Sequence, residues 1–208
     1  TFNHSLPPAS IIICAKNEDH NLNNYLPFVL EQDYPEFETV VVNDCSFDNT
    51  ADMLKELGKK YPHLRILTIK EDDYYSHGKK FAVMIGIKGA KYEHLLLTDA
   101  DCKPANNQWL KNMMRNYSDE TEIVIGYGAY EKLPGFLNKL IRFDIASNAI
   151  QFLSFALARK TYMGVGRNLS YKKSLFFKHK GFASHYHLES GDDDLFVNEA
   201  ETKYNVRV

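Results

Sequence analysis

Cysteine is scarce in this sequence of 208 residues, and its few cysteines form no recognisable pattern. Cys14, Cys45 and Cys102 are an odd number in a chain large enough to fold without disulfides. They include no CxxC pair and no Cys/His spacing typical of zinc ligands. We therefore expect neither a disulfide framework nor a zinc site, and we expect a reducing, cytoplasmic location.

Excess positive charge and long apolar runs are also missing. The formal net charge of −2 gives no basic surplus, which argues against a nucleic-acid partner. No run of 18 or more apolar residues is present, so we expect no membrane-spanning segment, and we find no signal peptide. The chain opens without Met and ends in a predicted strand, so we expect it to be part of a longer protein.

The first half of the sequence alternates short apolar runs with helical stretches. Strands are predicted at 10–15, 38–43, 64–69 and 93–98, and helices at 19–32, 51–61 and 79–90. The first helix is expected to break near Pro27. This order predicts an α/β fold with a doubly wound, mostly parallel sheet and right-handed crossovers. Such sheets bind ligands beyond the carboxyl ends of their strands, so the polar residues that follow each strand are the candidates.

The second half is less regular. It reads as a helix at 109–117, a strand at 122–130 and a long helix at 136–159 that includes Phe143 and Phe155. A glycine-punctuated loop at 162–168, a short strand and helix, and a final helix at 195–203 follow. We find no linker or repeat, so we expect one domain over 1–208, with halves at 1–103 and 104–208.

Two acidic groups follow predicted strands. Asp44 ends the second strand, and because Ser46 or Asp48 can cap the next helix, Asp44 is left to accept hydrogen bonds from a nucleotide base or ribose. Asp99 and Asp101 follow the fourth strand. Two carboxylates one residue apart share a face of an extended segment and can hold a hard divalent cation.

A third acidic group precedes the last predicted helix and runs from Glu189 through Asp192, Asp193 and Asp194. Some of these carboxylates can serve the positive end of the helix dipole. Three aspartates in a row exceed what capping needs, so we expect at least one to be functional.

Together these segments resemble the family 2 glycosyltransferases, which share the GT-A fold with cellulose and hyaluronan synthases. The resemblance covers nearly the whole chain. It rests on the following segments: Ile13 to Glu18, like the first nucleotide-binding strand and loop; Val42 to Ser46, like VxDxS; Gly78 to Ala82, like GKxxA; Asp99-Ala100-Asp101, like the DxD motif; Gly164 to Leu169, like the acceptor-side loop; and Gly191 to Leu195, where the family carries EDxDL.

The resemblance implies a role for each matched residue. Ala15, Asn17, Glu18, Asp44, Lys79, Asp99 and Arg167 would lie at the nucleotide sugar, and Asp101 with Asp99 would hold Mg²⁺ or Mn²⁺. Asp192 takes the place of the catalytic base, although Gly191 replaces the usual glutamate before it. Because that departure affects the alignment, Asp193 is the alternative base; otherwise its side chain is expected to point elsewhere and serve capping or packing.

The activity implied is metal-dependent, inverting transfer of a sugar from a nucleotide diphosphate sugar, with UDP favoured, to a hydroxyl of a glycan, lipid or other acceptor. The QxxRW motif of processive synthases is absent. Members of the family are often membrane-tethered, so segments outside this chain would anchor the protein at the inner face of the plasma membrane.

Two other functions stay open. A sugar-1-phosphate nucleotidyltransferase is the nearest enzyme, but it would need a glycine-rich loop after the first strand, where Ala15-Lys16-Asn17-Glu18 has no glycine. A dehydrogenase is not one of the two, because it would need GxGxxG at the same place and that motif is missing. A sugar-nucleotide-binding module without catalysis would keep Asp44 and the DxD motif but need no carboxylate at Asp192.

Overall fold

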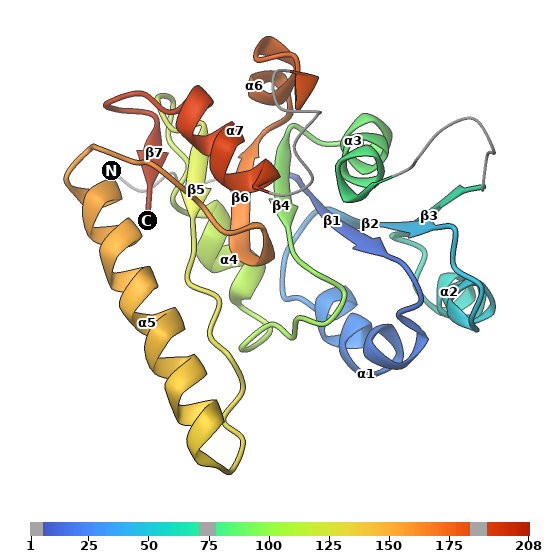
Figure 1. Cartoon of the computed structure of the whole chain (residues 1–208). Helices are drawn as coiled ribbons and strands as arrows, with labels where there is room; N and C mark the ends of the chain where they lie inside the picture. Colours follow the sequence, from blue (N-terminus) through green and yellow to red (C-terminus); the bar gives the residue numbers. More distant parts are fainter. Residues whose placement is uncertain (1–5, 71–77, 184–190) are drawn as a thin grey trace.

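Figure 1 presents the protein as a computed structural model, which describes residues 6–70, 78–183 and 191–208. A seven-stranded sheet runs through the molecule in the order β3-β2-β1-β4-β6-β5-β7. In chain order the strands are β1 (Ala9–Ala15), β2 (Phe37–Asp44), β3 (Leu64–Ile69), β4 (His94–Leu97), β5 (Ile123–Ile125), β6 (Leu169–Lys172) and β7 (Val206–Arg207).

The first half of the chain forms the parallel part of this sheet. Strand β1 pairs in parallel with β2 on one side and β4 on the other, and β2 pairs in parallel with β3. The connecting helices are α1 (Asp19–Leu30), α2 (Thr50–Lys60) and α3 (Lys79–Gly89). This arrangement confirms the predicted order of strands and helices.

Helices cover both faces of the sheet, as Figure 1 shows. Side chains of β1 alternate between two cores: Ile12 packs in the core that includes residues of α3, and Ile11 and Ile13 pack in the core that includes residues of α1 and α2. Helix α4 (Trp109–Met114) joins the second core, and α5 (Phe136–Leu157), α6 (Lys173–Lys178) and α7 (Asp192–Ala200) join the first. The strand predicted at 10–15 is therefore buried on both faces, as its apolar run indicated.

The remaining strands make the sheet mixed. Strand β6 runs antiparallel to β4 and to β5, and β7 pairs in parallel with β5. The structure thus confirms an α/β fold with a doubly wound, mostly parallel sheet.

The predicted break near Pro27 is wrong. Helix α1 continues through Pro27 to Leu30, and the carbonyl of Pro27 accepts a hydrogen bond from the backbone N–H of Glu31. Proline removes one donor from the helix ladder. Leu26 and Val29 lie on either side of it and are buried in the core, and this packing outweighs the missing hydrogen bond.

The strand predicted at 122–130 is shorter in the structure and ends at Ile125. The backbone at 126–128, beyond this point, is bound by residues 167–168. Gly126 N–H donates to the carbonyl of Asn168, the Asn168 side-chain amide donates to the carbonyl of Tyr127, and Arg167 Nε donates to the carbonyl of Gly128. Side chains therefore take the acceptors that a strand partner would have used.

Helix α5 rests on the domain through a narrow stripe. Its buried residues are Ala149, Phe152 and Ala156, whereas Phe143 and Phe155 are exposed. Among the described residues, α5 is the one helix long and apolar enough, by length and composition, to cross a membrane, and little of it is buried in the domain. The sequence predicted no spanning segment because no 18 consecutive residues are apolar. Helix α5 contains polar and charged residues, but its average composition is still apolar enough for a span.

Two helical glycines provide a test of how closely α3 approaches the sheet. A Cβ added at Gly86 in α3 would lie 2.7 Å from Ile12 Cγ2 and 3.1 Å from Val42 Cγ2, whereas one added at Gly58 in α2 would lie 3.4 Å from Ile66 Cδ1. Both substitutions to alanine gain the same helix propensity, about 1 kcal/mol. We expect Gly58→Ala to raise the free energy of unfolding in urea, and Gly86→Ala to lower it by about 1–3 kcal/mol through overpacking. Equal effects of the two variants would contradict the close packing of α3.

Candidate functional site

A cleft opens where the parallel strands end. It has a volume of about 480 Å³, which suits a small organic ligand. Its walls come from the segments that follow β1, β2 and β4 and from the start of α3. Predicted site residues that line it are Ala15, Glu18, Asp44, Lys79, Asp99 and Asp101.

The loops after β1 and β2 are bound to each other. Asn17 N–H donates to Ser46 Oγ over 2.9 Å, and Phe47 N–H donates to Asn17 Oδ1 over 2.9 Å. Asn17 and Cys45, at the bends that follow the two strands, have left-handed φ values of 58° and 52°. The structure therefore places Asn17 as a link between the loops, and among the described residues it is not one of those that line the cleft.

The sequence left open whether Ser46 or Asp48 caps helix α2, and the structure gives this role to Asp48. Asp48 Oδ1 accepts a hydrogen bond from the N–H of Thr50, the first residue of α2, over 3.0 Å. Ser46 instead accepts from Asn17. Asp48 thus serves the start of α2, and Asp44 is not needed there.

Asp44 presents an unsatisfied acceptor at the cleft. Its side chain is buried, and its Oδ1 has no hydrogen-bond partner among the described residues; the other such buried side-chain atom in this part of the chain is Thr39 Oγ1, within β2. A buried acceptor without a partner costs about 1–3 kcal/mol. An N–H or O–H group of a ligand in the cleft would remove that cost.

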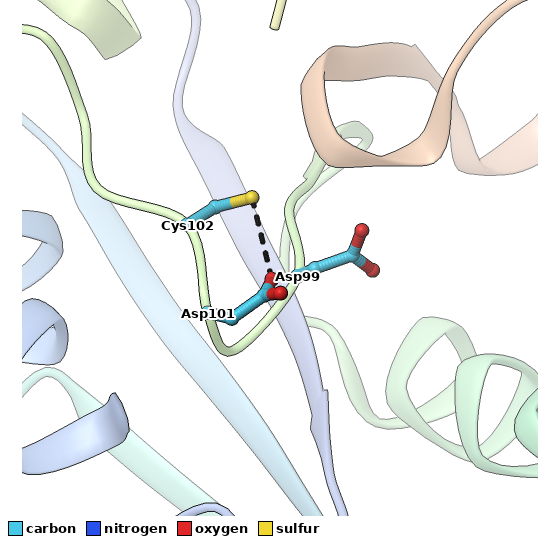
Figure 2. Close-up of side chains that lie close together, drawn as sticks. All are labelled: Asp99, Asp101 and Cys102. Carbon is cyan, nitrogen blue, oxygen red and sulfur yellow. Dashed lines mark hydrogen bonds between the residues drawn. The ribbon is translucent and has the colours of Figure 1, made fainter. Parts of the chain in front are cut away.

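The turn after β4 carries the other acidic group. Figure 2 shows Asp99, Asp101 and Cys102 leaving this turn, with the Cys102 thiol directed at the Asp101 carboxylate over 3.6 Å. One potential ligand atom from each of the three side chains lies within 4.8 Å of the others. Lys79 Nζ, at the start of α3, donates to Asp99 Oδ1 over 2.8 Å.

The donor atoms of this turn fit a hard divalent cation. Carboxylate oxygens are the ligands that Mg²⁺ and Mn²⁺ prefer. Four carboxylates line the cleft, those of Glu18, Asp44, Asp99 and Asp101, against the two lysines Lys16 and Lys79. Carboxylates that share a partly enclosed site repel one another, and a bound cation would relieve that repulsion.

Cys102 differs from its two acidic neighbours. Burial, and then the negative charges of Asp101 and Asp99, raise the pKa of the Cys102 thiol to about 11. The thiol therefore carries its proton at neutral pH, and the carboxylates are the stronger candidates for a hard cation.

A narrower recess adjoins the cleft and is lined by Cys14, Lys79 and Asp99, which the two share, and by Gly166 and Asp193. The carboxylate of Asp193 lies so close to Gly166 that a Cβ added there would be 2.0 Å from Asp193 Oδ2. The expectation that Asp193 points elsewhere is therefore wrong: its side chain faces the recess. The cause is that α7 begins at Asp192, three residues earlier than predicted, so Asp193 lies in its first turn.

The structure describes only some of the other residues around this third acidic group. Gly191 precedes α7 with a left-handed φ of 79°, a conformation that glycine adopts without strain and that a glutamate at this position would not. The side chain of Asp192 and all of Glu189 lie outside the described part of the chain. Asp192 as the base stays a prediction.

Arg167 contacts the segment that follows β5. Its Nε donates to the carbonyl of Gly128 over 3.0 Å, and its guanidinium lies 5.4 Å from the ring centre of Tyr130. Among the described residues it lines neither the cleft nor the recess. The geometry gives it a role in holding the segment after β5, and its contact with the nucleotide sugar stays a prediction.

Sequence reasoning missed some residues of the site. Cys14, near the end of β1, and Lys16, in the loop that follows, line the cleft on either side of Ala15 in the chain. Both lie in the matched segment Ile13 to Glu18, which was the available signal. Outside the cleft and the recess, Trp109 was also missed: its indole N–H donates to Asn168 Oδ1 over 2.9 Å and ties the start of α4 to the segment before β6. That contact spans 59 residues, and no local pattern indicates it.

Known proteins resemble this chain in both sequence and fold. The chain is 35% identical over 92 residues to a poly-beta-1,6-N-acetyl-D-glucosamine synthase of Staphylococcus epidermidis, a match that covers 44% of this chain and 21% of that protein. The structure superposes on a mannosyltransferase of Pyrobaculum calidifontis solved with GDP-Man and Mn²⁺, with a TM-score of 0.75, 20% identity, and coverage of 98% of this chain and 55% of that one. It also superposes on residues 1–349 of S. aureus TarS solved with UDP-GlcNAc, with a TM-score of 0.67, 21% identity, and coverage of 96% and 56%.

This chain thus spans about half of each of these solved chains and a smaller share of the synthase. The sheet and its helices have the GT-A fold, as the resemblance to family 2 glycosyltransferases implied. The family model for glycosyl transferase family 2 matches residues 10–179, which include the segments that follow β1, β2 and β4 around the cleft, and the chain therefore belongs to glycosyltransferase family 2.

Proposed function

We propose that this chain is the catalytic domain of an inverting glycosyltransferase that moves a sugar from a nucleotide diphosphate sugar to an acceptor hydroxyl. The observation that carries the proposal is the cleft itself. It brings the unsatisfied Asp44 carboxylate, the paired carboxylates Asp99 and Asp101, and the Lys79 ammonium to one edge of the sheet. These groups match the base, metal and phosphate parts of such a donor.

The donor is proposed to be a UDP-sugar. Asp44 Oδ1 is an acceptor that needs a donor, and a uracil N–H or a ribose hydroxyl supplies one. Lys79 lines the same cleft as Asp44 and the DxD turn, and its positive charge favours phosphate there. One similar structure holds UDP-GlcNAc and another GDP-Man, which supports a nucleotide sugar as the donor class.

A divalent cation, Mg²⁺ or Mn²⁺, is proposed at the carboxylates of Asp101 and Asp99. When bound there it would neutralise charge on the diphosphate leaving group. The Mn²⁺ in the similar mannosyltransferase supports this proposal. Lys79 contacts Asp99 in the structure, so the same lysine would help to balance the carboxylates and the diphosphate.

A carboxylate at the start of α7 is proposed to activate the acceptor hydroxyl. The acceptor hydroxyl attacks the anomeric carbon from the face opposite the diphosphate, the bond from that carbon to the phosphate oxygen breaks, and the hydroxyl proton passes to a carboxylate of α7. One displacement gives inversion. The resemblance assigns the proton to Asp192, and the position of Asp193 in the recess makes Asp193 the alternative.

Residues 1–103 are proposed as the donor half and 104–208 as the acceptor half of the domain. The acceptor would be a glycan, lipid or other hydroxyl compound in polysaccharide, glycolipid or cell-envelope synthesis at the cytoplasmic side of a membrane. A sugar-nucleotide-binding module without catalysis is the second candidate. It would use the same cleft, and the carboxylate of Asp193 beside Asp99 in the recess argues against it.

The first prediction concerns Asp44 and the nucleotide. UDP should raise the melting temperature, because a ligand that binds only the native state stabilises it. Asp44→Ala should abolish that shift and leave the apo protein no less stable, since the substitution removes an unsatisfied buried carboxylate. Asp52→Ala, which removes an exposed carboxylate from the first turn of α2, should keep the full shift. Differential scanning fluorimetry measures all three, and an undiminished UDP shift in Asp44→Ala would sink the assignment.

The second prediction concerns the metal. By calorimetry, UDP should bind more tightly in Mn²⁺ or Mg²⁺ than in chelator. Asp101→Asn should lose this difference, because an amide is a weaker ligand and carries no charge. Cys102→Ser is the matched neighbour and should keep it, because a hard cation prefers the carboxylates. Equal UDP affinity with and without metal in the parent protein would contradict the metal site.

The third prediction concerns the base. Asp192→Asn should bind UDP-sugar and metal almost normally, while its transfer rate falls by a factor on the order of 10²–10⁴, the usual contribution of a general base. Asp193→Asn should lower the transfer rate less, because the resemblance assigns the proton to Asp192. The comparison requires matched circular dichroism spectra and one working donor–acceptor pair.

The ranking of the two variants identifies the base. If Asp193→Asn loses transfer and Asp192→Asn keeps it, the base is the carboxylate that faces the recess. If both variants keep near-normal turnover, the acidic group is structural and the binding module becomes the better proposal.

A further inference from the structure

Helix α5 exposes an apolar stripe, interrupted by Ser147 and Ser154, on the side away from the domain core. Its buried residues, Ala149, Phe152 and Ala156, define the inner side of the helix. On the outer side, residues three or four positions apart line up along the helix axis. The large exposed residues on this stripe are Phe136, Leu140, Phe143, Ile150 and Leu157, with Phe136 74% and Phe143 73% exposed.

The stripe is largest near the start of the helix. Figure 1 shows α5 running along the β7 side of the molecule, with its first turns, in yellow, projecting beyond the sheet. Leu137 and Ile141 in these turns, and Tyr130 and Leu133 in the preceding loop, are also exposed. An exposed apolar surface of this kind marks an interaction site.

The inner side of α5 restricts how a membrane can meet it. Ala149, Phe152 and Ala156 belong to the core that α3, α6 and α7 share. A helix that crossed a bilayer would have to remove these residues from that core. Helix α5 can therefore keep the fold and contact lipid only by lying along the membrane surface.

The charges around the helix suit an anionic surface. Residues 131–160 contain the five cations Lys132, Lys139, Arg142, Arg159 and Lys160, and the two carboxylates Glu131 and Asp144. The whole chain has a net charge of −2, so this segment is locally positive on an otherwise slightly acidic protein. Each cation near an anionic leaflet adds to the binding free energy.

We propose that the outer face of α5, with the loop at 130–135, binds the surface of an anionic lipid bilayer. Phe136, Leu140 and Phe143 enter the boundary between headgroups and acyl chains, and the lysines and Arg142 contact the headgroups. Tyr130 lies at the same end, and tyrosine is enriched at such interfaces. This inference concerns lipid binding alone and does not depend on the proposed transfer activity.

A second copy of the chain fits the same face less well. A helix pair along the stripe would meet Ser147 and Ser154, which interrupt the apolar seam. It would also bring the local excess of cations on one copy toward the same cations on the other, whereas anionic lipid neutralises them.

Vesicle flotation of the 208-residue chain tests the proposal. The chain should float with vesicles of phosphatidylcholine and phosphatidylglycerol and bind vesicles of phosphatidylcholine alone more weakly. Phe136→Ser and Phe143→Ser should each lower the affinity by a factor on the order of ten, the contribution expected from burying one phenylalanine. Phe28→Ser is the matched control, because Phe28 is 45% exposed on α1, which packs in the other core, and it should bind as the parent does.

The cations are tested separately. The double variant Lys139→Gln, Arg142→Gln should lose about fivefold in affinity for each cation on anionic vesicles and almost nothing on neutral ones. Circular dichroism confirms that the exposed substitutions leave the fold intact.

Three results would overturn the proposal. The first is a parent chain that stays in the lipid-free fraction with both vesicle types, and the second is a pair of phenylalanine variants that both bind as the parent does. The third is a dimer, seen by sedimentation velocity without lipid, that Phe143→Ser converts to a monomer, in which case a second copy covers the face.

Discussion

Parallel pairing on both sides of β1 is the constraint on which the rest of the molecule depends. β1 is held between β2 and β4, with Ala15 opposite Asn43 and Ile12 opposite Leu97, so the segments that follow all three strands leave from one edge of the sheet. Parallel strands require helical crossovers, and these bury both faces of the sheet. At Gly86 the approach of α3 leaves no room for a Cβ, which fixes the helix whose first residue, Lys79, faces the cleft. The positions of Asp44, Lys79, Asp99 and Asp101 thus follow from backbone pairing and helix packing.

The same edge carries features that lower the stability of the folded domain. Asn17 and Cys45 adopt left-handed conformations that are uncommon outside glycine, Asp44 keeps an unsatisfied buried oxygen, and carboxylates are concentrated around the cleft. Each feature is unfavourable for an empty domain. A ligand that carries hydrogen-bond donors and a cation would relieve the two that line the cleft, the unsatisfied Asp44 oxygen and the concentration of carboxylates. Strain and unsatisfied polar groups of this kind cluster at functional sites because the surrounding structure holds them in place. A site with this balance should be stabilised strongly by its ligand.

The features that local sequence determines were predictable. An apolar run such as β1 indicates a strand buried on both faces, and an aspartate that directly follows such a strand must lie at its carboxyl end, so Asp44 and the Asp99 turn could be located without a structure. Features set by contacts between distant segments could not. Arg167 sits in a motif next to the acceptor side, yet its position depends on the carbonyl of Gly128 and the ring of Tyr130, 39 and 37 residues earlier. Asp193 faces the recess because α7 starts in a left-handed turn at Gly191 and because Gly166 leaves space for a carboxylate. Pro27 was misread for the same reason, since its effect on α1 is decided by the packing of Leu26 and Val29.

The direction of β5 links the cleft to α5. Both β4 and β5 run antiparallel to β6, so they point the same way and their carboxyl ends lie at the same edge of the sheet. The chain that leaves β5 leads through 126–135 to the exposed first turns of α5, and the turn that leaves β4 carries Asp99 and Asp101. If α5 lies on a bilayer, this edge of the domain is held close to the lipid surface. An acceptor hydroxyl carried by a lipid would then meet the recess without leaving the membrane, whereas an acceptor free in solution would gain nothing from that placement. If the proposed function and the proposed lipid contact both hold, an acceptor linked to lipid would fit this placement better than a free glycan or other hydroxyl compound.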